Sequence, residues 1–119
     1  MWIYQQSTGI LQHDGVEMST GYSGHGEGCN SPAHEGTPNV GPLPAGLYSI
    51  GAMFSHPKKG PVCMRLNPVG HDAHGRSGFM IHGDNSRCDR SASEGCIILD
   101  RNTRLKITQS NDKSLMVIA

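Results

Sequence analysis

A histidine and a cysteine fourteen residues apart, His82 and Cys96, are the residues of this chain best suited to nucleophilic chemistry. His82 ends the apolar run GFMIH, and Cys96 opens the apolar run CIIL after the small residues of SASEG. A thiol becomes a strong nucleophile when a neighbouring base takes its proton. Histidine titrates near neutrality, so it can take that proton and later return it to a leaving amine. The pair therefore predicts attack of a thiol on a carbonyl group.

Residues beside the pair are candidates to support this reaction. Gly95 has no side chain, so backbone next to Cys96 can come close to a substrate. The N–H groups of Gly95 and Cys96 are candidate donors to a developing oxyanion. Gly83 leaves open space beside the ring of His82 at a sheet edge. Asp84 is a candidate to orient that ring, although a backbone carbonyl could do so equally well.

Five further residues are candidates for binding substrate or shaping the site. Arg76 could bind carboxylates through two parallel hydrogen bonds, or it could be an ordinary surface arginine. Tyr22 and Ser23, in the motif GYSG, could line a substrate groove or simply pack within a glycine-rich loop. For Ser93 we favour a supporting role in the site over the satisfaction of a turn. Glu94 is a solvated loop charge or a carboxylate that raises the pKa of the neighbouring thiol.

The composition indicates one small domain without long helices. The chain has 119 residues, 16 of them glycine and 7 proline, and only 17% are charged. This length suits a single domain, and the glycine and proline content suits short strands joined by turns. The formal net charge is zero, which leaves no basic stripe for nucleic acid. No apolar stretch approaches the roughly 18 residues of a membrane span, and the N-terminal stretch lacks the features of a signal peptide.

Apolar runs separated by turns predict a mostly β domain over residues 1–119, a compact sandwich or barrel with long loops and at most one or two short helices. The segment 21–44 is expected to hold no regular element. The stretch DRNTRLKI is expected to form a short helix that begins near Asp100 or Asn102. The expected strands are Trp2–Gln6, Ile10–Gln12, Val16–Met18, Leu47–Ala52, Val62–Asn67, Phe79–His82, Ile97–Leu99 and Leu115–Ile118.

The four cysteines, Cys29, Cys63, Cys88 and Cys96, have no metal-type spacing and allow three full disulfide pairings. One disulfide among the first three would suit an oxidising compartment. A bond between Cys88 and Cys96 would block the nucleophile.

The histidines invite a zinc interpretation that their spacing does not support. His71 and His74 lie three residues apart in HDAH, and Cys29 lies near His25 and His34. These residues fall in scattered loops without a recognisable zinc core. We therefore expect no metal and no other cofactor.

The motifs IHGDN and SASEGCIIL resemble the signature of L,D-transpeptidases of the YkuD type, and VGPLPAGLYSI resembles a turn and strand of the same enzymes. Glu94 stands where that family has a second histidine, and the gap between His82 and Cys96 is short for it. The chain is more similar to the small L,D-transpeptidase-like effectors of type VI secretion. The matching pieces, in order, are Trp2, Tyr4, Gln6–Gly9, Gly21–Gly24, Gly41–Ile50, Gly75–Asp84 and Ala92–Ile97.

This resemblance implies an L,D-transpeptidase-like catalytic domain that acts on peptidoglycan. Cys96 would attack the carbonyl at the L-centre of meso-diaminopimelate in a tetrapeptide stem, and the terminal D-Ala would leave with a proton from His82. Water would resolve the thioester as an L,D-carboxypeptidase, a free D-amino acid would give exchange, and a second stem amine would give a 3–3 cross-link.

The same resemblance implies an antibacterial toxin made in the cytoplasm without a signal peptide. A secretion machine would deliver it into the periplasm of a target bacterium. The producing cell would then need an immunity protein that blocks the site.

Two other functions remain open from the sequence. One is a peptidoglycan-binding module that catalyses no reaction. The presence of His82, Gly95 and Cys96 argues against it. The other is a cysteine peptidase that cleaves within the stem, such as an NlpC-type endopeptidase. In that type the cysteine precedes the histidine, whereas here the order is reversed.

Overall fold

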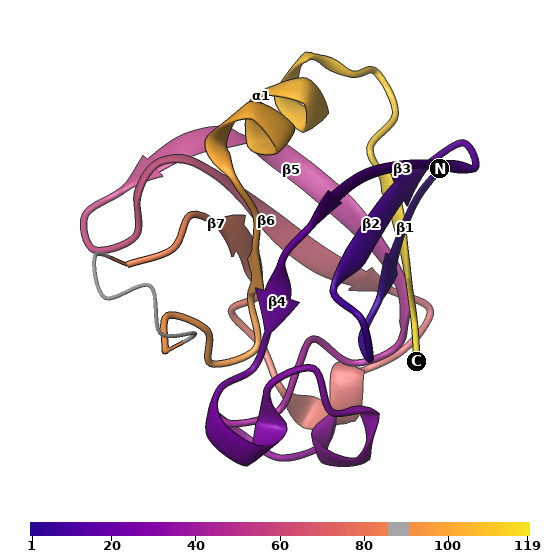
Figure 1. The fold of residues 1–119 in the computed structure, drawn as a ribbon, viewed down its shortest axis with the longest axis vertical. Helices are drawn as coiled ribbons and strands as arrows, with labels where there is room; N and C mark the ends of the chain where they lie inside the picture. Colours follow the sequence, from indigo (N-terminus) through magenta and orange to yellow (C-terminus); the bar gives the residue numbers. More distant parts are fainter. Residues whose placement is uncertain (86–90) are drawn as a thin grey trace.

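The computed structural model describes residues 1–85 and 91–119, which are built mainly of β-strands (Figure 1). The described part holds one α-helix, α1 (Arg101–Gln109), and three short 3-10 helices, η1 (Gly26–Gly28), η2 (Pro32–His34) and η3 (Ala73–Gly75). None of the described helices is long and apolar enough to cross a membrane. The strands are β1 (Trp2–Gln5), β2 (Ile10–His13), β3 (Val16–Thr20), β4 (Tyr22–Ser23), β5 (Gly46–His56), β6 (Gly60–Val69), β7 (Met80–His82), β8 (Ile97–Ile98) and β9 (Ser114–Ile118).

The described strands form one sheet in the order β3-β2-β1-β9-β5-β6-β7-β8-β4. Only the pairs β1–β9 and β7–β8 are parallel. The two ends of this order, β3 and β4, are separated in the chain by Gly21 alone, so the sheet must curl until its ends meet. A Cβ atom at Gly21 would lie 1.9 Å from the carbonyl oxygen of Ile98, which explains the glycine at this junction. The mostly β fold expected from the sequence is confirmed.

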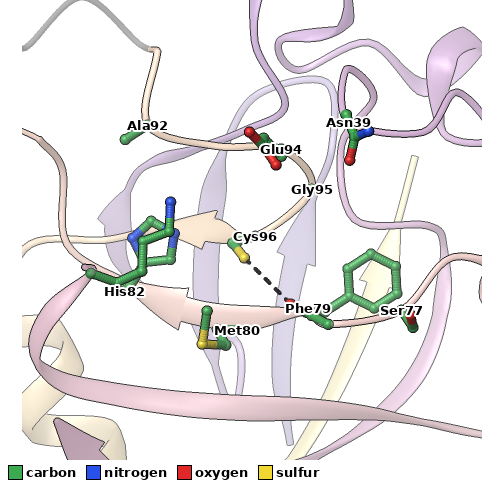
Figure 2. A pocket seen from close by; sticks show the side chains of 11 residues that line it. Asn39, Ser77, Phe79, Met80, His82, Ala92, Glu94, Gly95 and Cys96 are labelled. Atoms are coloured by element: carbon green, nitrogen blue, oxygen red, sulfur yellow. Dashed lines mark hydrogen bonds between the residues drawn. The ribbon is translucent and has the colours of Figure 1, made fainter. Parts of the chain in front are cut away.

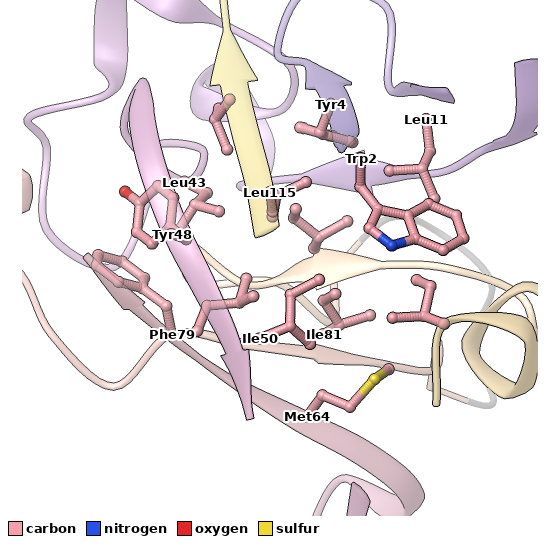
Figure 3. Packing of buried hydrophobic residues seen from close by; sticks show 14 of the residues in the cluster. Trp2, Tyr4, Leu11, Leu43, Tyr48, Ile50, Met64, Phe79, Ile81 and Leu115 are labelled. Carbon is pink, nitrogen blue, oxygen red and sulfur yellow. The ribbon is translucent and has the colours of Figure 1, made fainter. Parts of the chain in front are cut away.

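The core lies inside the curled sheet (Figure 3). Strand β1 shows how the sequence builds it, because Trp2 and Tyr4 are buried while Ile3 between them is only half-buried, as the two-residue period of a strand requires. The indole N–H of Trp2 donates to the carbonyl oxygen of Asp112 at 2.9 Å. The large apolar members of the core include Trp2, Tyr4, Leu11, Leu43, Tyr48, Met64, Phe79, Ile81, Ile97, Ile107 and Leu115.

Helix α1 begins as the sequence predicts, with Asp100 as its N-cap. The Asp100 carboxylate accepts a hydrogen bond from the backbone N–H of Thr103 at 3.2 Å, the usual interaction of an N-cap side chain. Ile107 is fully buried on the inner face of the helix. Arg104 donates to the carbonyl oxygens of Leu99 and Val62 at 3.0 and 3.1 Å. These bonds fix the helix against β6 and the end of β8.

Two expectations about elements were wrong. The segment 21–44 contains β4, η1 and η2. Strand β4 pairs with β8 through only two residues, too few to show a periodic pattern. Strands β5 and β6 also extend beyond the predicted 47–52 and 62–67, because their backbone pairing continues past the core with exposed side chains.

Candidate active site

The parallel pairing of β7 with β8 brings His82 and Cys96 together. Ile81 lies opposite Ile97 and His82 opposite Ile98, so Cys96, which immediately precedes β8, enters the sheet beside β7. Both side chains line a hollow of about 130 Å³, here called the inner hollow (Figure 2). Its walls are formed by Asn39, Lys59, Ser77, Gly78, Phe79, Met80, His82, Ala92, Glu94, Gly95 and Cys96.

The His82 ring is held as a neutral base with a defined tautomer. Its Nδ1 atom lies 2.8 Å from the carbonyl oxygen of Gly83, and because a carbonyl can only accept, Nδ1 carries the proton. Nε2 therefore keeps its lone pair, is buried, and has no hydrogen-bond partner among the described residues. Burial lowers the pKa of His82, and the charges of Lys59 and Arg104 act in the same direction. The ring can accept a proton at Nε2 near neutral pH.

The Cys96 thiol is also neutral at rest. Its residue is 8% exposed, and the sulfur lies 3.9 Å from the carbonyl oxygen of Gly78. Burial raises the pKa of the Cys96 thiol, and a hydrogen bond from the backbone of Met80 together with the charge of Lys59 offsets only part of this increase. A buried neutral thiol needs a base to become a nucleophile, and His82 lines the same hollow.

The turn before Cys96 is organised by the buried hydroxyl of Ser93. This hydroxyl donates to the carbonyl oxygen of Cys96 at 2.6 Å and accepts the N–H groups of Gly24 and Gly95 at 2.8 and 3.2 Å. Ser93 is fully buried, so it does not face the groove, and it contacts neither His82 nor the space for substrate. The N–H of Gly95 is already engaged by Ser93, which makes the N–H of Cys96 the better candidate for an oxyanion donor.

Arg76 lies against this turn from the other side. Its Nη1 donates to the carbonyl oxygens of Glu35 and Pro42 at 2.6 and 2.8 Å. Its Nη2 donates to those of Gly41 and Glu94 at 3.1 and 3.0 Å. Each Nη carries two hydrogens, so both are saturated by backbone carbonyls. The expectation that Arg76 binds substrate carboxylates bidentately does not fit this geometry.

The space beside Gly95 is filled by this arginine. Gly95 has φ of +132°, and a Cβ atom there would lie 2.5 Å from Nη2 of Arg76 and 3.3 Å from the Phe79 ring. The space beside Gly95 is therefore occupied by the Arg76 guanidinium and is not open to a substrate.

Tyr22, Ser23 and Asp84 are joined to the loops around the site by hydrogen bonds. The Tyr22 hydroxyl donates to the Asp84 carboxylate at 2.7 Å and accepts the N–H of Ala92 at 3.1 Å. Burial, and then the bond to Asp84, raise the pKa of Tyr22 well above its usual value. The hydroxyl of Ser23 is buried and accepts the N–H of Leu43 at 2.8 Å. None of the three lines the inner hollow, and Gly83 rather than Asp84 is the partner of the His82 ring.

The inner hollow continues into two others, and together they form one groove. The outer hollow, about 170 Å³, is lined by Lys58, Lys59, His82, Gly83, Asp84, Asn85, Ser91, Ala92 and Glu94. On the opposite side a third hollow shares Asn39, Ser77, Phe79 and Glu94 with the inner one. Glu94 is exposed and borders all three hollows. The Cys96 thiol lines only the inner hollow.

Two residues of the site were missed from the sequence. His25 lies 2.9 Å, through Nδ1, from the carbonyl oxygen of Ser93. Lys59 borders both the inner and the outer hollow. It lies on the turn between β5 and β6, in the motif PKKG, and the sequence has no signal that this turn reaches the groove.

The other described cysteines, and the histidines of HDAH singled out from the sequence, do not line the inner hollow. Cys29, Cys63 and Cys96 are free thiols, so the structure contains no Cys29–Cys63 disulfide, and Cys88 lies outside the described residues. His71 and His74 have separate partners, Leu47 and Glu35.

Among the described residues, the one cluster with metal-ligating groups within 4.8 Å of one another is His13, Asp14 and Asp112. The N-terminal ammonium already pairs with both of its carboxylates. This cluster is not the HDAH histidine set considered from the sequence.

Comparisons with known proteins identify the family and a similar fold. The model of the Tlde1 domain, a family of type VI effector L,D-transpeptidases, matches residues 17–118. Among solved structures, the chain is similar to the helical cell shape determining protein Pgp2 from Campylobacter jejuni, with a TM-score of 0.62 and 24% identity. The match covers 98% of this chain and 46% of that one, so the chain spans about half the length of Pgp2. No curated protein matches the chain.

Proposed function

The chain belongs to the Tlde1 domain family, and we propose that residues 1–119 form a cysteine-dependent L,D-carboxypeptidase or exchange enzyme that acts on peptidoglycan stems. The observation that carries this proposal is the buried Nε2 of His82, which has no partner in the described part of the chain and lies in the same hollow as the Cys96 thiol. A neutral base beside a neutral thiol is the arrangement that general-base activation of a nucleophile requires.

The reaction follows from these positions. Nε2 of His82 takes the thiol proton while the sulfur of Cys96 attacks the carbonyl carbon at the L-centre of diaminopimelate. The Cys96 N–H donates to the oxyanion that forms. The C–N bond then breaks, His82 returns its proton to the nitrogen, and D-Ala leaves. Water or a free D-amino acid, deprotonated by His82, attacks the thioester and restores the thiol.

Incubation with disaccharide-tetrapeptide muropeptides tests this proposal. The wild-type chain and its Cys96→Ala variant are compared, with and without an added D-amino acid, and products are read by mass spectrometry. Loss or exchange of D-Ala that requires Cys96 is the expected result. Cleavage inside the stem would favour the endopeptidase alternative, and binding without any change of mass would favour the peptidoglycan-binding module.

For the cellular role, we propose an antibacterial effector that acts in the periplasm of a target bacterium and is countered by an immunity protein seated over the groove. Family membership supports this role. Export of the wild-type chain to the periplasm of a test bacterium should arrest growth, whereas the Cys96→Ala variant or retention in the cytoplasm should not. Equal growth with the exported wild-type and Cys96→Ala chains would contradict the proposal.

A further inference from the structure

Lys59 is a cation at the edge of the groove that contains Cys96. It lies on the turn that joins β5 (Gly46–His56) to β6 (Gly60–Val69), on the side of the molecule where β7 ends (Figure 1). It is half-buried and borders both the inner hollow, which contains Cys96, and the outer hollow, which does not. Its charge acts on both members of the candidate pair, because it lowers the pKa of His82 and of the Cys96 thiol.

The ammonium of Lys59 has no ion pair and no hydrogen bond within the described parts of the chain. Its backbone N–H donates to His56, and its carbonyl oxygen accepts from the Cys63 thiol. Lys58, the neighbouring cation, is exposed and borders the outer hollow but not the inner one. The Nη groups of Arg76 are saturated by carbonyl oxygens, and the ammonium of Lys113 donates to the carbonyl oxygens of Ile107 and Thr108. Partial burial of an unpaired charge is unfavourable. An anion that enters the groove would therefore be bound at this point.

The proposed function, on which this inference rests, defines where a substrate anion falls. The nitrogen that leaves must reach Nε2 of His82, because that atom supplies its proton. The outer hollow includes His82 but not Cys96, so it lies on the leaving-group side. In a C-terminal residue a single carbon separates this nitrogen from the free carboxylate. The carboxylate thus comes to the boundary between the two hollows, which Lys59 borders.

We propose that Lys59 is a specificity-determining residue whose ammonium binds the free α-carboxylate of the residue that leaves. The chain then removes single C-terminal residues and discriminates against stems in which this carboxylate is blocked. By microscopic reversibility, a free D-amino acid that resolves the thioester places its own carboxylate on Lys59.

Two synthetic tetrapeptide stems that differ only at the C-terminus, one a free acid and the other a carboxamide, test this assignment. The kcat/KM for release of the terminal residue is measured with the wild type, Lys59→Gln and Lys59→Arg. Lys106→Gln is the matched control, because it removes the same charge from the exposed face of α1. A charge-assisted hydrogen bond contributes enough for a preference of about tenfold or more for the acid. Lys59→Gln should lose this preference through slower turnover of the acid alone, whereas Lys59→Arg and Lys106→Gln should retain it.

Two results would overturn the assignment. In the first, the Lys59→Gln variant keeps the preference for the acid stem. In the second, it releases the terminal residue more slowly from both stems by the same factor. The second result would mean that the ammonium acts on the thiol or the oxyanion instead. The affinity of Cys96→Ala for the two stems, with and without Lys59→Gln, provides a readout independent of turnover. If the wild type releases nothing from either stem, the proposed function fails, and the difference in Kd between acid and amide still decides the role of Lys59.

Discussion

Nδ1 of His82 donates to the carbonyl oxygen of Gly83, its own neighbour in the chain, at 2.8 Å. The orientation of the ring thus depends on the local backbone at the end of β7, and no carboxylate in residues 1–85 or 91–119 bonds to it. Without a carboxylate partner an imidazolium gains little stabilisation, and burial lowers the pKa of His82 further. The candidate pair therefore consists of an imidazole and a thiol, both neutral, rather than an ion pair.

The first prediction concerns the reactivity of Cys96 as a function of pH. Because burial raises the pKa of its thiol, alkylation by iodoacetamide should be slow at pH 7. It should still be rising above pH 8.5, near the ordinary pKa of cysteine. Mass spectrometry of the peptide that contains Cys96 separates this thiol from the others. His82→Gln should leave the profile almost unchanged, whereas fast alkylation at pH 6 that disappears in His82→Gln would reveal a thiolate–imidazolium pair instead.

The second prediction concerns Arg76, which joins the loop of residues 35–42 to the turn at Glu94 through four carbonyl oxygens. A lysine cannot satisfy four acceptors in this planar arrangement. Arg76→Lys should lower the free energy of unfolding by about 2 kcal/mol and reduce kcat, with KM little changed. Denaturant titration and kinetics measure these quantities. Arg65→Lys, at an exposed position, is the control, and a raised KM with full stability would instead indicate direct binding of substrate.

The third prediction concerns Ser93, whose hydroxyl serves two N–H groups and one carbonyl in a fully buried turn. Ser93→Ala leaves these groups without their partner, and an unsatisfied buried polar group costs about 1–3 kcal/mol. Thermal unfolding should show a clear loss of stability, whereas Ser55→Ala, at an exposed position on β5, should be nearly neutral. A stable Ser93→Ala variant that cannot turn over substrate would show that Ser93 acts in the chemistry after all.

The strands that face the core could be predicted because their apolar residues follow the two-residue period. Trp2 and Tyr4 on β1 and Leu115 on β9 are buried as that pattern requires. The cap of α1 could be predicted from Asp100 alone, because an N-cap depends on residues within one turn. The proximity of His82 and Cys96 could be predicted from the motifs IHGDN and SASEGCIIL. His82 ends β7 and Cys96 immediately precedes β8, and these two strands pair in parallel.

The partners of Arg76 and the position of Lys59 at the groove could not be predicted, because each depends on segments far apart in the chain that the fold brings together. Arg76 binds carbonyl oxygens 34 and 41 residues away, and no local pattern marks a backbone carbonyl as an acceptor for it. The burial of Ser93 depends in the same way on Gly24, 69 residues distant. Lys59 reaches the groove because β5 and β6 extend beyond the core. Many side chains at these strand ends are exposed, so the sequence there lacks the apolar pattern that would predict the extension.

The last prediction separates two reasons for a glycine at position 95: the positive φ of its backbone and the close approach of the Arg76 guanidinium. Gly95 and Gly15 both have a positive φ, +132° and +84°, which an alanine adopts only with strain. A Cβ atom at Gly15 would meet nothing within 4 Å, whereas at Gly95 it would lie 2.5 Å from Nη2 of Arg76. Gly15→Ala should therefore lose only about 1 kcal/mol of stability.

Gly95→Ala should lose more than Gly15→Ala and should also inactivate the enzyme, because the displaced guanidinium no longer holds the turn that carries Cys96. Unfolding and D-Ala release measured on both variants test this difference. If loss of the Arg76 contacts is the cause, Gly95→Ala should lower activity little further when it is introduced into an Arg76→Ser variant. Equal losses in Gly15→Ala and Gly95→Ala would mean that backbone conformation alone requires the glycine.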